Sequence, residues 1–364
     1  MLSHGMWFHT LIKNSKRQFM RLLLFSFVLL LVSSCKQERY ELPLKEDVTI
    51  LLSVCDEGET KSVPIVDEDA ISDINLFFYD INGMLAFSEY VEHPGRKIEA
   101  QIYADREYSL YAVANVGSLI EDQNVMTERG LLALALEISD KRDIVNPDGT
   151  LPMSARLPLQ QISKGESLEL PLVRMVSRFR LIVDTSSLES DLDKFEIKRV
   201  TLKNLNKKVF YFERSRAASE EDLLDAGESY RGEDLYPIFT TGVDFYLLEN
   251  AQGDLLSGNT TEQGHVPPDD FAGLCTYVEI VVDYRSSSHY DENLIYRYYL
   301  HDGAKLDNFD VLRNTMYLCT THFTGDGISE NSWRVDLSGM KDLVVSMNIA
   351  PSSFTFTELD QTLT

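Results

Sequence analysis

Apolar and polar residues alternate with a period of two along most of the chain after residue 40. In the first such segment the apolar positions are Val48, Ile50, Leu52 and Val54. A period of two is that of a β-strand with one buried face. Further short segments of this kind follow, separated by turn signals such as Asn82-Gly83. Many short strands without a βαβ rhythm predict an all-β fold built from antiparallel β-sandwiches.

The pattern also predicts how the strands are grouped along the chain. We expect strands over residues 46–55, 74–79, 84–91, 98–103, 108–116, 167–173, 179–184, 195–202, 244–248, 275–284, 294–300, 314–323, 333–337, 343–349 and 354–356. Residues 98–103 and 108–116 are expected to pair as a hairpin. Residues 125–139 carry the one convincing helical pattern in the first half, which predicts a small helical insertion. The boundary between two sandwiches is expected near residue 174, giving domains over 35–173 and 174–364.

A basic and then apolar segment precedes Cys35. Residues 22–32 form an apolar run, preceded by four basic residues and no acidic one. Such a run is about 16 Å long as a helix, too short for a bilayer core of about 30 Å. We therefore expect residues 1–34 to be a removed export signal, with either Met1 or Met20 as the true start. The Val-Ser-Ser-Cys ending looks like a bacterial lipobox, which predicts lipidation at Cys35; the alternative is a plain secretory signal with an incidental cysteine.

The charge balance excludes several classes of partner. The chain has 34 basic and 58 acidic residues, and the four basic residues before Cys35 would be lost with the signal, leaving a net charge of −28. Such a surface repels nucleic acid phosphates and anionic lipid headgroups. We therefore expect no nucleic-acid partner, and membrane attachment only through a lipid.

The residues that usually carry chemistry are scattered. The histidines after Cys35 are His93, His265, His289, His301 and His322, without the spacing of a zinc site. No nucleophile elbow or phosphate-binding loop is present, and the carboxylates are too numerous for one pair to stand out. We expect no catalytic residue, no metal and no cofactor. Either a bridge or two buried thiols would account for the pair Cys275 and Cys319.

Several motifs together resemble the fimbrillin lipoproteins of Bacteroidales, the subunits of type V pili. Besides the lipobox at Cys35, the similar segments are INLFFYDING at 74–83, YSLYAVAN at 108–115, LPMS at 151–154, LVRMVSR at 172–178, YLLENAQG at 246–253 and FDVLRNTMY at 309–317. Their order and spacing make the resemblance specific, although Ser177 stands where alanine is usual. The resemblance implies two tandem transthyretin-like β-sandwiches and a non-enzymatic role in a surface fimbria at the outer membrane.

The resemblance also implies assembly by strand exchange with other fimbrial subunits. In that family a first strand is often clipped away after an arginine, and a partner's C-terminal strand fills the groove. The only arginine between Cys35 and Arg96 is Arg39, which precedes the first strand. We therefore expect Val48, Ile50, Leu52 and Val54 to be retained, as suits a lipid-anchored anchor or minor subunit. The donor-strand candidates are Leu343, Val345, Met347, Ile349, Phe354 and Phe356; alternatively, they form the last strands of the chain's own sandwich.

Two other functions are compatible with the sequence. The chain could be a surface lipoprotein that binds a glycan or a host protein, with contacts presented by residues 286–296, which include Tyr290 and Tyr296. A third hypothesis is an exported hydrolase, and no group of residues in the sequence supports it.

Overall fold

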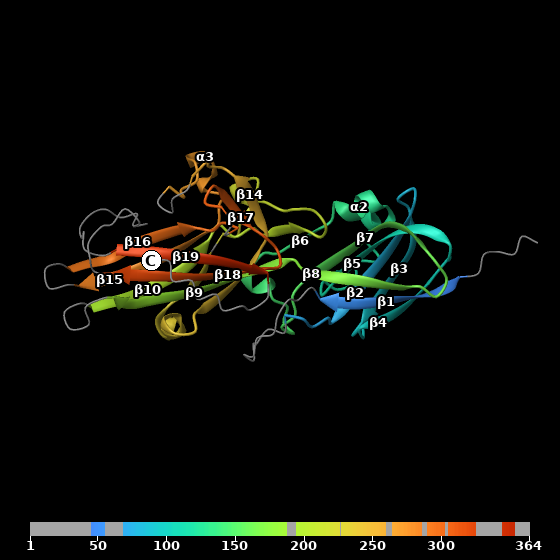
Figure 1. Ribbon diagram of the computed structural model, residues 1–364, viewed down its shortest axis with the longest axis horizontal. Coiled ribbons are helices and arrows are strands. Elements are labelled where there is room, and N and C mark those ends of the chain that lie inside the picture. Colours follow the sequence, from blue (N-terminus) through green and yellow to red (C-terminus); the bar gives the residue numbers. More distant parts are fainter. Residues whose placement is uncertain are drawn as a thin grey trace, which may run out of the picture. The chain divides into compact units, whose positions relative to one another are not determined.

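The computed structural model describes residues 45–54, 68–187, 194–225, 227–259, 264–285, 290–302, 305–324 and 344–353 (Figure 1). Within these ranges the chain is built mainly from β-strands, with a few short helices. The predicted all-β sandwich fold is therefore confirmed.

The first half of the chain forms one seven-stranded sheet. Its strands are β1 (Glu46–Val54), β2 (Asp73–Asp80), β3 (Leu85–Glu92), β4 (Lys97–Ile102), β5 (Arg106–Ala114), β7 (Met153–Ile162) and β8 (Ser167–Arg174). They follow the order β3-β2-β5-β7-β8-β1-β4. Buried residues of β1, β4 and β8 share one core with buried residues of β2, β5 and β7, so the two ends of this sheet face each other as a sandwich.

The predicted hairpin between residues 98–103 and 108–116 is wrong. Strand β4 pairs antiparallel with β1, whereas β5 pairs with β2 and β7. Between them Asp105 adopts a φ of 59°, and its backbone N–H donates to the Ile162 carbonyl oxygen. Both strands contribute buried side chains such as Ile98 and Leu110 to the same core. They therefore face each other across the core instead of pairing.

The helical insertion is shorter than predicted. Residues 125–139 contain the end of η1 (Gln123–Met126), α2 (Glu128–Leu132) and a strand, β6 (Ala135–Glu137), with η2 (Lys141–Asp143) following. Thr127 caps α2, and β6 pairs with β11 (Lys208–Phe210). Val125 and Leu131 pack with Phe77, Tyr79 and Tyr111. The insertion therefore covers the second face of β2 and β5, which explains why both strands are buried on both sides.

The second half of the chain forms two four-stranded sheets. One has the order β12-β10-β15-β16, from β10 (Lys194–Lys203), β12 (Glu228–Tyr230), β15 (Tyr277–Arg285) and β16 (Tyr290–Tyr299). The other has the order β13-β9-β18-β19, from β9 (Val176–Ser187), β13 (Val243–Leu248), β18 (Thr315–Thr324) and β19 (Val344–Ser353). Shorter elements connect them: η3 (Glu220–Asp222), η4 (Gly232–Phe239), β14 (Asn250–Asp254), α3 (Asp269–Ala272) and β17 (Asn308–Val311).

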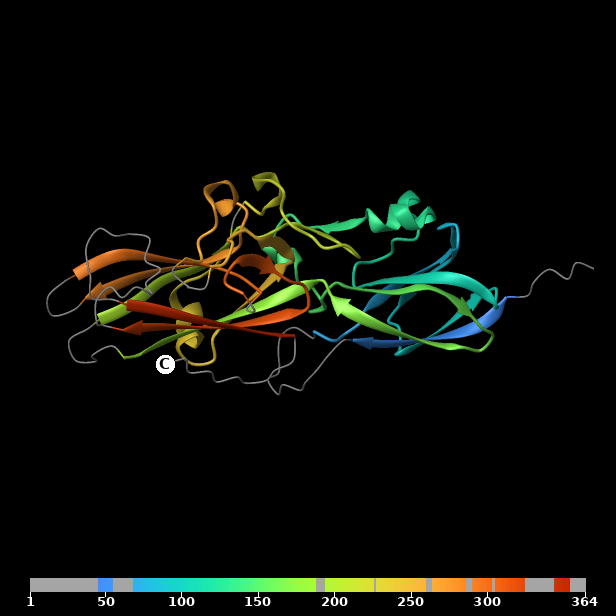
Figure 2. The same ribbon diagram turned by 45° about the horizontal axis from the view of Figure 1, so that its top comes forward.

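The two halves repeat one strand plan. In the first half β3-β2-β5-β7 face β8-β1-β4, and in the second β12-β10-β15-β16 face β18-β9-β13. The first strand lies parallel to the last strand of the plan in both halves, β1 to β8 and β9 to β18. Met175 alone separates β8 from β9. Among the described strands of the large sheets, β19 is an addition to this plan, because it lies outside β18 (Figure 2), while β6, β11, β14 and β17 form separate two-stranded sheets.

Candidate functional site

Strand β1 is held from both sides within its sandwich. It pairs antiparallel with β4 from Glu46 to Leu51 and parallel with β8 from Thr49 to Val54. The Thr49 N–H donates to the Glu166 carbonyl oxygen at 3.0 Å, and the Leu52 N–H donates to the Arg96 carbonyl oxygen at 2.9 Å. Removal of β1 would therefore leave β8 without a partner along one edge, and β4 without the strand with which it pairs among the described residues.

The predicted buried residues of β1 do lie in the core. Val48 and Ile50 are fully buried, Leu52 is 5% exposed, and Val54 packs against the same cluster. Leu51 points the other way and is 37% exposed. This alternation fixes the register of β1, since a slip by one residue would exchange the two faces.

Strand β19 has a simpler environment. It pairs antiparallel with β18 over ten residue pairs, from Thr315 with Ser353 to Thr324 with Val344. Among the described strands it forms the edge of its sheet. The donor candidates Val345, Met347 and Ile349 lie in β19, opposite Phe323, Thr321 and Cys319. The other candidates, Leu343, Phe354 and Phe356, lie outside the described residues, as does the lipidation candidate Cys35.

A buried polar cluster holds the chain just before β2 against the second sandwich. The Glu68 carboxylate accepts from Arg178 Nη1 at 2.9 Å and from the Tyr246 hydroxyl at 2.6 Å. Arg174 Nε donates to the Glu68 carbonyl oxygen at 2.8 Å, and the same guanidinium pairs with Asp69. Arg174 and Arg178 are 1% and 4% exposed. We call these residues, Glu68, Asp69, Arg174, Arg178 and Tyr246, the Glu68 clamp.

The clamp pairs the buried guanidinium groups of Arg174 and Arg178 with the carboxylates of Asp69 and Glu68, of which Asp69 is half exposed. Burial, followed by the charge of Glu68, raises the pKa of Tyr246, so its hydroxyl remains a donor at neutral pH. Burial also acts to raise the pKa of Asp244, but the Arg180 hydrogen bond and the charge of Arg178 outweigh it and hold that pKa below its usual range. Removing one member of such a group leaves a buried charge unpaired.

The clamp was not predicted from sequence. Glu68 is one of 58 acidic residues, and its partners Arg178 and Tyr246 lie 110 and 178 positions away. The one available signal was the pair of arginines in the strand segment LVRMVSR, where alternation places Arg174 and Arg178 on one face with Val176 between them.

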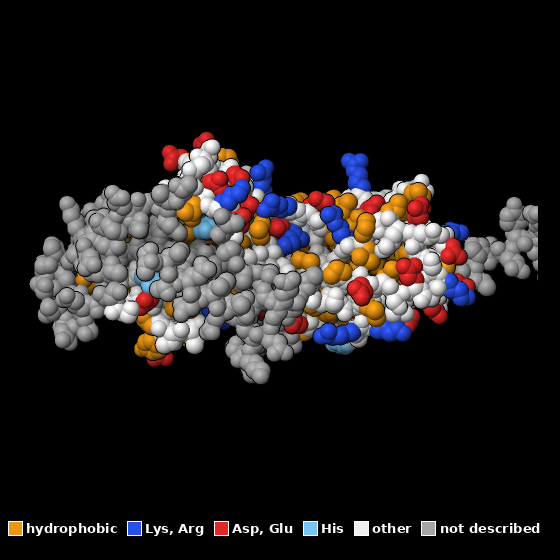
Figure 3. All heavy atoms as spheres, in the orientation of Figure 1, with side chains coloured by type: hydrophobic (Ala, Val, Ile, Leu, Met, Phe, Trp, Pro, Cys, Tyr) orange, Lys and Arg blue, Asp and Glu red, His pale blue; other side chains and the backbone are white. Residues whose placement is uncertain are grey.

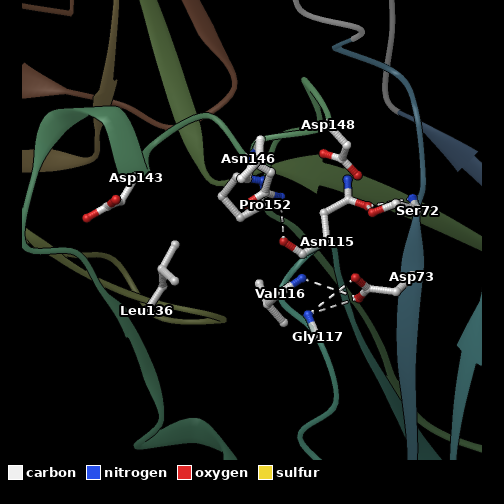
Figure 4. A pocket seen from close by; sticks show the side chains of 11 residues that line it. Ser72, Asp73, Asn115, Val116, Gly117, Leu136, Asp143, Asn146, Asp148 and Pro152 are labelled. Carbon is white, nitrogen blue, oxygen red and sulfur yellow. Dashed lines mark hydrogen bonds between the residues drawn. The ribbon is translucent and has the colours of Figure 1, made fainter.

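A polar pocket of about 410 Å³ lies where the insertion meets β2 and β5 (Figure 4). Asn115, with a φ of 62°, holds its wall: its side chain accepts from the Ser72 N–H at 2.8 Å and donates to the Leu151 carbonyl oxygen at 2.7 Å. The Asp73 carboxylate accepts from the Val116 and Gly117 N–H groups at 3.2–3.3 Å. These groups are satisfied by one another, so the network acts as a structural support for the loop after β5.

The histidines and cysteines form no reactive group in the described part of the chain. His265 and His301 are buried, His322 Nδ1 lies 2.8 Å from an Asp184 carboxylate oxygen, and His93 occupies a turn. His289 lies outside the described residues. No three His, Cys, Asp or Glu side chains among the described residues are arranged to hold a metal ion.

Cys275 and Cys319 are both buried thiols, so the pair does not form a disulfide. Burial raises the pKa of Cys275 to about 12, which keeps the thiol protonated and unreactive. Tyr296 is 2% exposed and lies in the core, so it does not present the surface contact expected of residues 286–296. Within the described ranges, no helix is both long and apolar enough to cross a membrane.

A sheet face of the second sandwich gathers charges that sequence reasoning also missed. Glu279 on β15 is buried, and its carboxylate binds Arg199 and Lys203 from β10 and Arg297 from β16. Burial acts to raise the pKa of Glu279, but the Arg297 hydrogen bond and the nearby cationic charges hold it below its usual range.

Comparison with known proteins finds the same architecture. A family model described as a domain of unknown function (DUF4906) matches residues 245–321. No curated protein matches the chain. Among solved structures, a protein from Parabacteroides distasonis assigned to cell adhesion is 14% identical with a TM-score of 0.58, and covers 84% of this chain and 99% of its own.

Two fimbrial proteins from Porphyromonas gingivalis are also similar. The fimbrilin FimA is 14% identical with a TM-score of 0.55, over 86% of this chain and 99% of its own. The tip fimbrial protein Mfa3, solved with a C-terminal truncation, is 12% identical with a TM-score of 0.53, over 83% of this chain and 99% of its own. The predicted resemblance to fimbrillins is therefore confirmed as a shared fold: this chain has the β-sandwich fold of these fimbrial and cell-adhesion proteins.

Proposed function

We propose that this chain is a structural, non-catalytic subunit of a cell-surface fimbria. The fold that it shares with the fimbrilin FimA and the fimbrial protein Mfa3 supports this role. We infer further that the chain joins other fimbrial subunits by strand exchange and acts as an anchor or minor subunit.

The observation that carries the proposal is the position of β19. Each sandwich completes its strand plan without it, and among the described strands β19 pairs with β18 alone, at the edge of its sheet. A strand in this position can leave its sheet without opening either sandwich. Its backbone can then pair with the strands that line a groove on another subunit. Val345, Met347 and Ile349 are the described residues that β19 would offer.

The position of β1 supports the anchor or minor role. This strand fills the groove between β4 and β8 with three buried side chains, Val48, Ile50 and Leu52. While β1 remains, that groove has no room for a donor strand from another subunit. A subunit that keeps β1 would therefore donate a strand without accepting one, as expected at the end of a fibre.

The subunit would be attached to the membrane by lipid. Residues 1–34 would direct export and be removed, and lipids on Cys35 would hold the chain at the outer membrane. The two sandwiches would then occupy residues 35–173 and 174–364, with the boundary beside Met175. The strongly acidic composition leaves lipid as the means of attachment.

Three measurements test this function. In the Cys35→Ala variant the mature protein should leave the outer-membrane fraction, with Cys275→Ala as the matched control that stays; identical fractionation of all forms would contradict the anchor. A chain ending at Thr324 should fold but fail to join its partner subunit. Mass spectrometry of the fimbria-bound protein should recover residues 46–54, and their absence would contradict retention of β1.

A further inference from the structure

One face of the β12-β10-β15-β16 sheet gathers more basic than acidic side chains around Glu279. Arg199 Nη2 and Lys203 Nζ lie 3.1 and 3.3 Å from the same Glu279 carboxylate oxygen, and Arg297 Nε lies 2.9 Å from the other. Glu279 itself is only 2% exposed. The three cationic side chains are 33–38% exposed, so they cover the acid and leave about a third of their own surface open to solvent.

The charge at this position is opposite to that of the chain as a whole. Three cations surround one carboxylate, whereas the full chain carries a net charge of −24. Further along the same strands Lys198 binds both Glu196 and Asp283, a group with more acid than base. On the face drawn in Figure 3, acidic and basic side chains are interspersed. The cluster around Glu279 is therefore a local cationic surface on an acidic protein.

The pairing of the cations is also incomplete. Arg199 Nε is buried and has no hydrogen-bond partner within the described ranges. The hydrogen bonds to Glu279 use a single nitrogen of Arg199 and of Arg297, although a guanidinium carries five N–H donors. An anion that approaches this face would therefore meet planar groups suited to a carboxylate or a sulfate.

Two aromatic rings adjoin the cations. Tyr277 on β15 and Tyr299 on β16 are cross-strand partners whose ring centroids lie 5.1 Å apart. The Arg297 guanidinium lies over the Tyr277 ring at 5.5 Å. Both rings are half-buried and alternate with the core residues of their strands, so they share the outer face with Arg297. Flat, partly apolar rings beside cations suit a ligand that has an apolar ring face and an anionic substituent.

We propose that this face, formed by Arg199, Lys203, Arg297, Tyr277 and Tyr299, binds an acidic saccharide. A sugar ring would pack against the exposed parts of Tyr277 and Tyr299, and its carboxylate or sulfate would bind the three cations. An acidic peptide that adds a strand would instead need the backbone edge of β16. The cations project from the face of the sheet and not from its edge, which favours the saccharide.

The test uses the purified chain and three hexameric probes: hexagalacturonate, the uncharged galactohexaose and hexaglutamate. At about 0.15 M salt, where long-range attraction is screened, hexagalacturonate should bind saturably, and the other two probes at least tenfold more weakly. The double variant Arg199→Gln/Lys203→Gln and the variant Tyr277→Leu should each weaken binding at least tenfold. Lys198→Gln, on the same strand in the acid-rich group, should change it by less than twofold.

A further variant separates binding from a merely structural role. Glu279→Gln removes the one acid in the cluster and keeps its shape, so it should tighten hexagalacturonate binding severalfold in protein that still melts cooperatively. Absence of saturable binding, equal binding of galactohexaose, or equal loss with Lys198→Gln would overturn the proposal. Equal binding of hexaglutamate would assign the face to an acidic polypeptide instead. None of these outcomes depends on whether the chain assembles into a fimbria.

Discussion

Strands β1 and β19 stand at opposite ends of the described chain and differ in how they are held. Strand β1 has partners on both edges and places Val48, Ile50 and Leu52 in the core. Among the described strands, β19 has a partner on one edge and adds to a strand plan that is complete without it. Loss of β1 would therefore open a sandwich, whereas loss of β19 would only uncover the edge of β18. The donor should therefore be the last strand and not the first.

The largest expected effect is in the core face of β1. Ile50→Asp places a carboxylate at a fully buried position and should cost about 5 kcal/mol of unfolding free energy, or prevent folding. Leu51→Asp, next to it on the exposed face, should cost about 1 kcal/mol or less. A chain ending at Thr324 should keep both sandwiches folded, and its free energy of unfolding should fall by less than that of the Ile50→Asp variant. Urea unfolding measures all three free energies. Equal losses for the variants at Ile50 and Leu51 would contradict the packing of β1 in the core and, with it, the expected retention of the strand.

The second effect concerns the Glu68 clamp, in which Glu68 and Asp69 before β2 bind residues of β8, β9 and β13. Arg178→Met removes a buried cation from Glu68 and Asp244 and should cost about 3 to 4 kcal/mol. In a double-mutant cycle with Glu68→Gln, the two losses should fall short of additivity by more than about 1 kcal/mol, since the residues are in contact. Additive losses measured by urea unfolding would show that the clamp does not act as a unit.

The third effect is a loss of stability at low pH that is expected in the second sandwich. Burial, and then His265, lowers the pKa of His301 to about 4, against 6.5 for an unperturbed histidine. Between these values the unfolded chain binds a proton that the folded chain does not. The second sandwich should therefore lose about 3 kcal/mol of stability as the pH falls from 6.5 to 4. His301→Phe should flatten this slope, and an unchanged slope in urea unfolding at several pH values would assign it to other groups.

The smallest effect is a difference between β1 and β19 in the rate of amide hydrogen exchange. In the folded chain the slowest amides of β1 should exchange with deuterium at least about tenfold more slowly than those of β19. The reason is that β1 exchanges only when its sandwich opens, whereas an edge strand can open by itself. Exchange measured on peptic fragments gives both rates, and equal protection of the two strands would remove the basis for the comparison.

The sequence predicted the faces of strands better than their partners. The buried face of β1 follows from the alternation of Val48, Ile50 and Leu52, because only one face of that strand is apolar enough to be buried. The pairing of β4 with β1 does not follow, because β4 and β5 have the same period and are close in sequence. Their separation depends on long-range packing around the core.

The same limit applies to the candidate sites. Residues 125–139 carry leucines at spacings that fit a helix. In the structure, however, Leu136 lies in β6 and Leu134 directly before it, and both pack against one hydrophobic cluster. The cations around Glu279 are ordinary surface residues in sequence and meet only because β10, β15 and β16 lie side by side. Contacts of this kind depend on sheet register, which a single sequence does not reveal.

The most direct test locks β19 onto β18. Ile349 is the register partner of the native Cys319, so Ile349→Cys can form a cross-strand disulfide without a second substitution. With that bridge closed, as shown by thiol titration, we expect a folded chain that cannot join its partner subunit until a reductant opens the bridge. The control Ile349→Cys/Cys319→Ser should join under both conditions. Equal assembly of the locked and the reduced chain would contradict donation of β19.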